Sequence, residues 1–151
     1  MYIPDTDGID HINIYSKGKT ELGRLLTNFA YSPFEYLNYG RFNSVEAFWY
    51  YYLTECKYEH LKGLYGFNAK QEGKKLNPRK YTEEDKEIIL EAIRCKLRQN
   101  RNILNLLEES CLPLTHYYAY GNSGNYKIYN MEEYSWITDE ISRIRDIIKG
   151  S

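Results

Sequence analysis

Glu46 and the aromatic residues that follow it are the part of the sequence best suited to chemistry. The acid stands at the start of an expected helix, two residues before the aromatic run Phe48–Tyr52. A carboxylate beside stacked rings suits a site that holds a planar base and acts on the sugar attached to it, because base–aromatic stacking is worth about 1–3 kcal/mol per base. Trp49, together with Tyr50 or Tyr52, is the candidate for stacking. The alternative is an ordinary core helix, in which the aromatic run supplies the buried stripe.

Two interpretations of Glu46 are open from the sequence. If Asn43 is the N-cap, Glu46 occupies the third helical position, and its carboxylate can return to the cap amide as in a capping box. Alternatively, the carboxylate is an acceptor that orients water or binds a ribose hydroxyl. Amides at a helix start favour the ionised form, which would make Glu46 a base or hydroxyl anchor rather than an acid.

Lysines form two clusters. Lys17 and Lys19 flank a glycine in an expected turn, and Lys70 belongs to a second group with Lys74 and Lys75. Either cluster could bind phosphates, and a desolvated lysine could attack a sugar C1′ to give a Schiff base. For any single lysine, solvated loop charge is the simpler explanation.

His116, Tyr118 and Tyr120 end a predicted strand beside the turn GNSGN, and pocket edges are often built in this way. A lone histidine is more often packed or hydrogen-bonded than catalytic. The three cysteines and three histidines are scattered, which predicts neither a disulfide framework nor a metal site. No metal and no cofactor is expected.

Composition narrows the class of protein. The chain has 151 residues, 42% of them apolar, and a net charge of −1, so it can form its own core and is not a strongly basic nucleic-acid coat. No stretch approaches the roughly 18–20 apolar residues of a membrane span, and the acidic start MYIPDTDGID is no signal peptide. We expect a soluble cytoplasmic protein.

The elements that must position these residues are mostly helices. Apolar spacing and capping signals predict helices near 43–60, 82–100, 102–109 and 131–149, with Thr82-x-x-Asp85 as a capping pattern. Short strands are expected near 9–15 and 112–121, and a hairpin or extended loop over 31–42. A long, mostly irregular basic connection is expected over 61–81. The predicted class is mainly α with a few short β-strands, as a single compact domain over 1–151 with a flexible N-terminus over 1–8.

Three segments resemble motifs of the NADAR family, also called YbiA-like. Residues 25–50 are similar to its opening motif through Asn28-Phe29, Pro33-Phe34 and Ser44-Val45-Glu46, with Ala47 where His is common. The segment AKQEGKK resembles the family's Ala-Lys-x-x-Gly-Lys/Arg element, and CKLRQNRNILNLL resembles its Lys-Phe-x-Gln-Asn helix pair. The resemblance covers about residues 12–121, in family order, and is nearest to small phage-type members.

The resemblance implies an α+β fold that is mainly helical, and hydrolysis of N-glycosidic bonds in ADP-ribosyl or related phosphoribosyl compounds. It makes Glu46 the essential acid, places Asn28 and Phe29 along the site, brings Lys70 to phosphate and leaves Lys17 or Lys19 as a nucleophile. The expected partner is a small-molecule nucleotide or an ADP-ribosylated nucleobase, with transient nucleic-acid contact and no membrane.

The C-terminal part departs from the family. An Asp-x-x-Trp-Gly-x-Gly segment is usual there, and HYYAYG stands in its place, with Tyr118, Tyr120 and Gly121 the nearest equivalents. A second hypothesis is therefore a catalytically degenerate module that binds a nucleotide, ADP-ribose or a protein partner.

Overall fold

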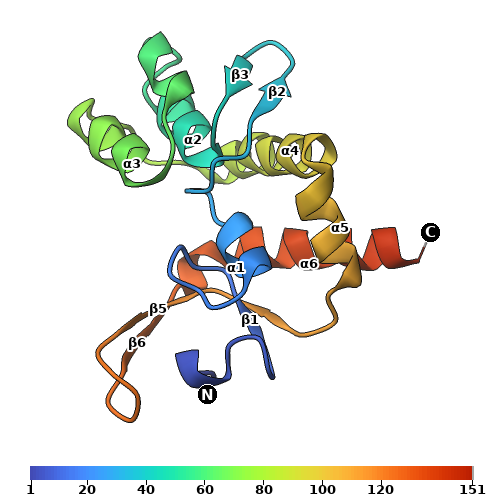
Figure 1. Ribbon diagram of the computed structural model, residues 1–151. Coiled ribbons are helices and arrows are strands. Elements are labelled where there is room, and N and C mark those ends of the chain that lie inside the picture. The colour runs from blue at the N-terminus through green and yellow to red at the C-terminus, as the bar shows by residue number, and fades with distance from the viewer. Residues whose placement is uncertain (151) are drawn as a thin grey trace. The chain divides into compact units, whose positions relative to one another are not determined.

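The computed structural model describes residues 1–150 and is mainly helical with a few short strands, as predicted (Figure 1). Internal packing divides the chain into two compact units. One consists of residues 1–27 together with the chain from Asn105 onward, and the other of Asn28–Leu104. Each unit is described by itself, and the assignment of residues 1–151 to one domain stays a prediction. No helix within residues 1–150 is long and apolar enough to cross a membrane.

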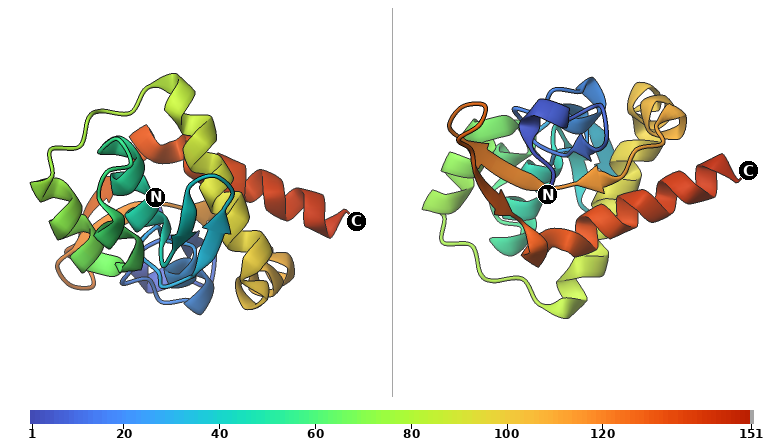
Figure 2. Two further views of the ribbon diagram at one scale, coloured as in Figure 1. Left: turned by 90° about the horizontal axis from the view of Figure 1, so that it is seen from above. Right: turned by 90° about the horizontal axis from the view of Figure 1, so that it is seen from below.

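The Asn28–Leu104 unit is built from a hairpin and helices. Its elements are β2 (Phe34–Tyr36), β3 (Gly40–Phe42), α2 (Val45–Leu53), the 3-10 turn η2 (Glu59–Gly63), α3 (Gly66–Lys75), α4 (Glu83–Gln99) and the first turn of α5 (Arg101–Glu109). Strands β2 and β3 are antiparallel, so of the two predicted alternatives, a hairpin or an extended loop, the hairpin is the one observed. Helices α2 and α3 lie side by side in all views (Figures 1 and 2).

The other unit contains short strands and the last helix. Its elements are η1 (Pro4–Thr6), β1 (Ile12–Asn13), α1 (Glu21–Leu25), β4 (Leu114–Thr115), β5 (Tyr117–Tyr120), β6 (Lys127–Asn130), η3 (Glu132–Tyr134) and α6 (Ser135–Lys149). Strands β1 and β4 pair in parallel, and β5 and β6 form an antiparallel hairpin. The predicted strand over 112–121 is therefore split in two, and its second part turns at GNSGN into a strand that the sequence pattern did not reveal.

An aromatic cluster joins the β2–β3 hairpin to α2. Phe48 is fully buried, with its ring centroid 5.0 Å from that of Tyr36 and 5.2 Å from that of Phe42. Tyr52 stacks on Phe48 one helical turn later, at 5.7 Å. Offset and edge-on pairs at these separations add to the burial of the rings. The core interpretation of the aromatic run is therefore confirmed for Phe48, whereas Tyr52 is half-buried at the edge of the cluster and donates its hydroxyl to Asp85.

Helix α2 is shorter than predicted. It ends at Leu53 rather than near His60, because Glu55 and Cys56 adopt left-handed backbone conformations with φ of 63° and 57°. The Cys56 amide returns to the Tyr51 carbonyl at 2.9 Å, which closes the helix end. The apolar periodicity of the sequence continues past Leu53, but periodicity carries no information about the left-handed backbone that ends the helix there.

The basic stretch 61–81 is also more ordered than predicted. It begins within η2 and contains the ten-residue helix α3, so the expected irregular connection is wrong over 66–75. Its low apolar content concealed the helix, since α3 buries only the small residues Ala69 and Gly73.

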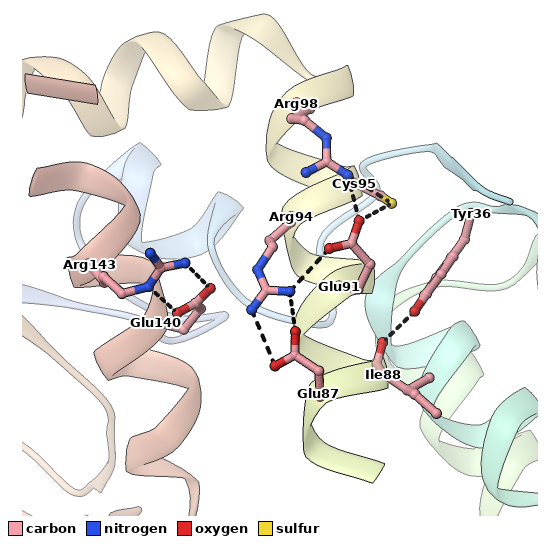
Figure 3. Close-up of polar contacts among 9 residues, drawn as sticks. All are labelled: Tyr36, Glu87, Ile88, Glu91, Arg94, Cys95, Arg98, Glu140 and Arg143. Atoms are coloured by element: carbon pink, nitrogen blue, oxygen red, sulfur yellow. Dashed lines mark hydrogen bonds and ion pairs between the residues drawn. The ribbon is translucent and has the colours of Figure 1, made fainter. Parts of the chain in front are cut away.

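Helix α4 matches its prediction closely. Thr82 and Asp85 form the reciprocal capping box, and the helix ends at Gln99. Its exposed face carries an ion-pair ladder, in which Arg94 contacts Glu87 at 2.6 Å and Glu91 at 3.1 Å (Figure 3).

The C-terminal end of α4 is tied to the hairpin by amide side chains. Gln99 donates to the Glu35 carbonyl at 2.8 Å and accepts from the Glu35 amide at 2.7 Å. Asn100 donates to the Pro33 carbonyl at 3.0 Å. The Gln-Asn pair thus satisfies backbone groups along β2 and fixes the hairpin against the helix.

Candidate functional site

Glu46 does not cap its helix. The N-cap of α2 is Ser44, whose hydroxyl accepts from the Ala47 amide at 3.0 Å, so Glu46 is the second helical residue. The Asn43 amide, to which the carboxylate was expected to return, donates instead to the Lys62 carbonyl at 2.9 Å. The capping-box interpretation of Glu46 is therefore wrong, because a cap one residue later and a contact from η2 satisfy both groups.

The backbone of Glu46 is joined to the segment that precedes the hairpin. Its amide donates to the Asn28 carbonyl at 2.9 Å, and the amide of Gly66 donates to the next carbonyl, that of Phe29, at 2.8 Å. The neighbouring carbonyls of Asn28 and Phe29 thus bind the first turn of α2 and the first turn of α3 to the same short segment of the chain. This arrangement brings Asn28 and Phe29 beside Glu46.

The carboxylate of Glu46 is in an unusual electrostatic environment. Burial raises its pKa to about 7, although the lysines Lys70 and Lys74 act in the opposite direction. The side chain keeps partial contact with solvent, and the carboxylate makes no hydrogen bond within residues 1–150. The expectation that helix amides keep Glu46 ionised is corrected, since the loss of hydration outweighs them and both protonation states are populated near neutral pH.

Helix α3 supplies the two lysines. Lys70 and Lys74 are four residues apart and so share one face of the helix, and the Lys70 ammonium lies 5.9 Å from the centre of the Phe29 ring. Neither lysine forms an ion pair within residues 1–150. The positive charge next to Glu46 is therefore not neutralised by a structural carboxylate.

Close packing of α3 on α2 fixes this face. Ala69 and Gly73 are fully buried one turn apart, and a Cβ on Gly73 would stand 2.1 Å from the Tyr50 Cγ. Tyr50 itself is buried, so its ring packs on the backbone of α3. Trp49 is half-buried and lies edge-on to Tyr81 at 5.3 Å. A stacking role for either ring stays a prediction.

The lysine turn belongs to the other unit. Lys17 and Lys19 are both exposed, and Gly18 between them is buried. The buried Asp7 carboxylate accepts from the Lys19 amide at 2.9 Å, and Arg24 donates to the Gly18 carbonyl at 2.8 Å. The turn is thus held by its backbone and leaves both ammonium groups in solvent.

The remaining candidates lie on strand β5 or, in the case of His116, directly before it, also in that unit. His116 donates from Nδ1 to the Ile14 carbonyl at 2.7 Å, and burial lowers the pKa of its imidazole. Tyr118 stacks on Tyr15 at 5.4 Å, and Tyr120 is half-exposed. His116 is thus anchored through Nδ1 and favours the neutral state.

The structure brings together Glu46, Asn28, Phe29 and Lys70 from the predicted set. Lys74 joins them. The sequence would have indicated this only if residues 66–75 had been recognised as a helix, because residues four positions apart then share one helix face. The predicted candidates Lys17, Lys19, His116, Tyr118 and Tyr120 belong to the other unit. Comparisons of the chain with protein-family models, with curated proteins and with solved structures find no match.

Proposed function

We propose that this protein hydrolyses an N-glycosidic bond in an ADP-ribosyl or related phosphoribosyl compound, either a nucleotide or an ADP-ribosylated base. The observation that carries the proposal is the state of Glu46. Its carboxylate is not used as a helix cap, has a pKa of about 7, and faces two lysines without ion-pair partners. Strongly shifted acids with a specific charge partner are typical of functional sites. Membership of the NADAR family and a cytoplasmic location are part of this proposal.

Glu46 has the properties that glycosidic hydrolysis requires. In its ionised form it stabilises positive charge at C1′ as the bond to the base lengthens, and it accepts a proton from the attacking water. The water oxygen bonds to C1′, the C1′–N bond breaks, and the proton held by Glu46 passes to the departing base. A pKa near the working pH serves both halves of this transfer.

In this proposal, positively charged lysines bind the phosphate groups of the substrate. Lys70 and Lys74 hold the phosphate groups, because an ammonium on a flexible stem is a suitable point charge for phosphate. Asn28 and Phe29 line the sugar, and Trp49 is the candidate for the leaving base. The Schiff-base route through Lys17 or Lys19 is a separate version of the chemistry. It predicts a covalent adduct that borohydride traps on one of these lysines.

The test is release of ADP-ribose from ADP-ribosylated guanine nucleotides or DNA by the purified protein. Glu46→Gln should abolish release while circular dichroism and the unfolding transition remain those of a folded protein. Glu35→Gln is a matched control, because Glu35 is exposed in the same unit and contacts Gln99 only through its backbone. Full activity of Glu46→Gln would refute the assigned role.

A second candidate is a binding module without turnover. It is favoured by residues 116–121, HYYAYG, which replace the Asp-x-x-Trp-Gly-x-Gly segment of the family. Thermal stabilisation by ADP-ribose without hydrolysis of any conjugate would support this candidate. Absence of a response to every nucleotide would favour a protein partner instead.

A further inference from the structure

Two tyrosines near the Glu46 site expose their rings to solvent. Tyr31 is 56% exposed and Tyr65 is 52% exposed, and their ring centroids are 5.2 Å apart with the planes inclined at 66°. Phe67, two residues beyond Tyr65, is 61% exposed. Single exposed apolar residues are ordinary, whereas adjoining exposed aromatic rings are candidates for a binding surface.

The backbone that holds Glu46 also holds this pair. Tyr65 directly precedes Gly66, whose amide donates to the Phe29 carbonyl at 2.8 Å, and Tyr31 lies two residues after Phe29. The short stretch from Asn28 to Tyr31 therefore contacts the Glu46 backbone first, the Lys70 ammonium next through the Phe29 ring, and Tyr65 last. Three residues of chain span at most about 10 Å, so the backbone positions from which these three contacts are made are close neighbours.

This order matches the order of groups in an ADP-ribosyl compound. The ribose that carries the reacting C1′ is followed by two phosphates and then by adenosine. Along residues 28–31, the backbone of Glu46, the ammonium of Lys70 and the exposed ring of Tyr65 are contacted in the same sequence, and Lys74 stands one helical turn beyond Lys70 on α3. Adenine has a face that stacks on aromatic side chains, and its phosphates are drawn to Lys70 and Lys74.

We infer that Tyr31 and Tyr65 form a second base subsite, which stacks the adenine of the substrate while Lys70 and Lys74 hold the pyrophosphate. This inference rests on the proposed function for the identity of the ligand. It assigns the leaving base and the adenine to different aromatic groups, with the phosphates between them.

The experiment compares two ligands by calorimetry or by NMR titration: ADP-ribose, and ribose 5-phosphate, which lacks the base. Tyr31→Ala and Tyr65→Ala should each weaken ADP-ribose binding by at least about fivefold, the lower end of the stacking range. Binding of ribose 5-phosphate should be unchanged, and Tyr31→Phe should bind ADP-ribose as the unaltered protein does. Tyr129→Ala is the control, since Tyr129 is 49% exposed and also lies edge-on to another tyrosine.

The outcomes separate this inference from the proposed function. Loss of ADP-ribose affinity in the tyrosine variants, with no hydrolysis by the unaltered protein, supports the subsite and refutes the enzyme. Hydrolysis by the unaltered protein, with unchanged ADP-ribose affinity in the tyrosine variants, supports the enzyme and refutes the subsite. Equal weakening of both ligands, or no binding of ADP-ribose to the unaltered protein, overturns the subsite.

Discussion

The main-chain amide of Glu46 donates a hydrogen bond to the carbonyl oxygen of Asn28, 2.9 Å away. This bond satisfies one of the free amides at the start of α2 with backbone from outside the helix. The Ser44 hydroxyl satisfies another. Because these two amides of the first turn already have acceptors, the helix does not need the Glu46 side chain as a cap, and the carboxylate is available for another purpose.

Replacement of Glu46 by Gln should alter the pH dependence of stability. A carboxyl group whose pKa is raised from 4.5 to about 7 binds more protons in the folded state over that interval, so stability falls as the pH rises through it. The Gln variant should lose this slope and be more stable than the unaltered protein at pH 8, by up to about 3 kcal/mol. Chemical denaturation at pH 4 and pH 8 measures the change. Destabilisation at pH 8 would show that the carboxylate is a structural cap after all.

Removal of the Lys74 charge should raise the pKa of Glu46 further. Lys70 and Lys74 both favour the ionised carboxylate and so oppose the rise in pKa that burial causes. Lys74→Met removes part of this opposition and moves the titration of Glu46 above pH 7. A pH–rate profile, or NMR of the labelled Glu46 carboxyl carbon, reports the shift. Lys75→Met is the matched control, because Lys75 lies next along α3 and contacts Glu72 at 3.7 Å. An equal shift in both variants would argue against a specific effect of Lys74.

Gly73→Ala should loosen the packing of α3 on α2. The new methyl group would meet the Tyr50 ring at 2.1 Å, and relief of such overlap requires a shift of one helix. Overpacking of this kind costs typically about 1–3 kcal/mol. Gly63→Ala is the control, because a Cβ there meets nothing within 4 Å. Urea denaturation of the two variants should give a lower midpoint only for Gly73→Ala.

Asp85→Asn should weaken the start of α4. Asp85 is buried and accepts from Arg79 at 2.7 Å, Tyr52 at 2.7 Å and the Thr82 amide at 2.7 Å, and the Arg79 guanidinium holds the pKa of its carboxyl well below the usual range. Its contribution is present above the unfolded pKa of about 3.9 and is lost as the pH falls through the folded pKa.

We expect Asp85→Asn to lower the free energy of unfolding by about 2 kcal/mol at pH 7, in line with hydrogen bonds to a charged group. The difference from the unaltered protein should shrink in strong acid. Glu84→Gln, an exposed neighbour in the same turn, should have little effect. An undiminished difference at low pH would show that the charge of Asp85 is not what stabilises the helix start.

The sequence by itself determined the elements that depend on neighbours along the chain. The capping box of Thr82 and Asp85, the long helix after it, the hairpin at residues 34–42 and the aromatic stripe of Phe48 and Tyr52 are all set by local hydrogen bonds or by periodicity. These interactions involve residues only a few positions apart, so the pattern of residue types reports them.

Tertiary structure decided the state of Glu46. The Asn43 amide is satisfied by Lys62, the Glu46 amide by Asn28, and the opposing charges come from a helix more than twenty residues away along the chain. A local capping pattern and a functional acid have the same sequence at this position. They differ only in which groups the fold brings within hydrogen-bonding distance and in how much water it removes from the carboxylate.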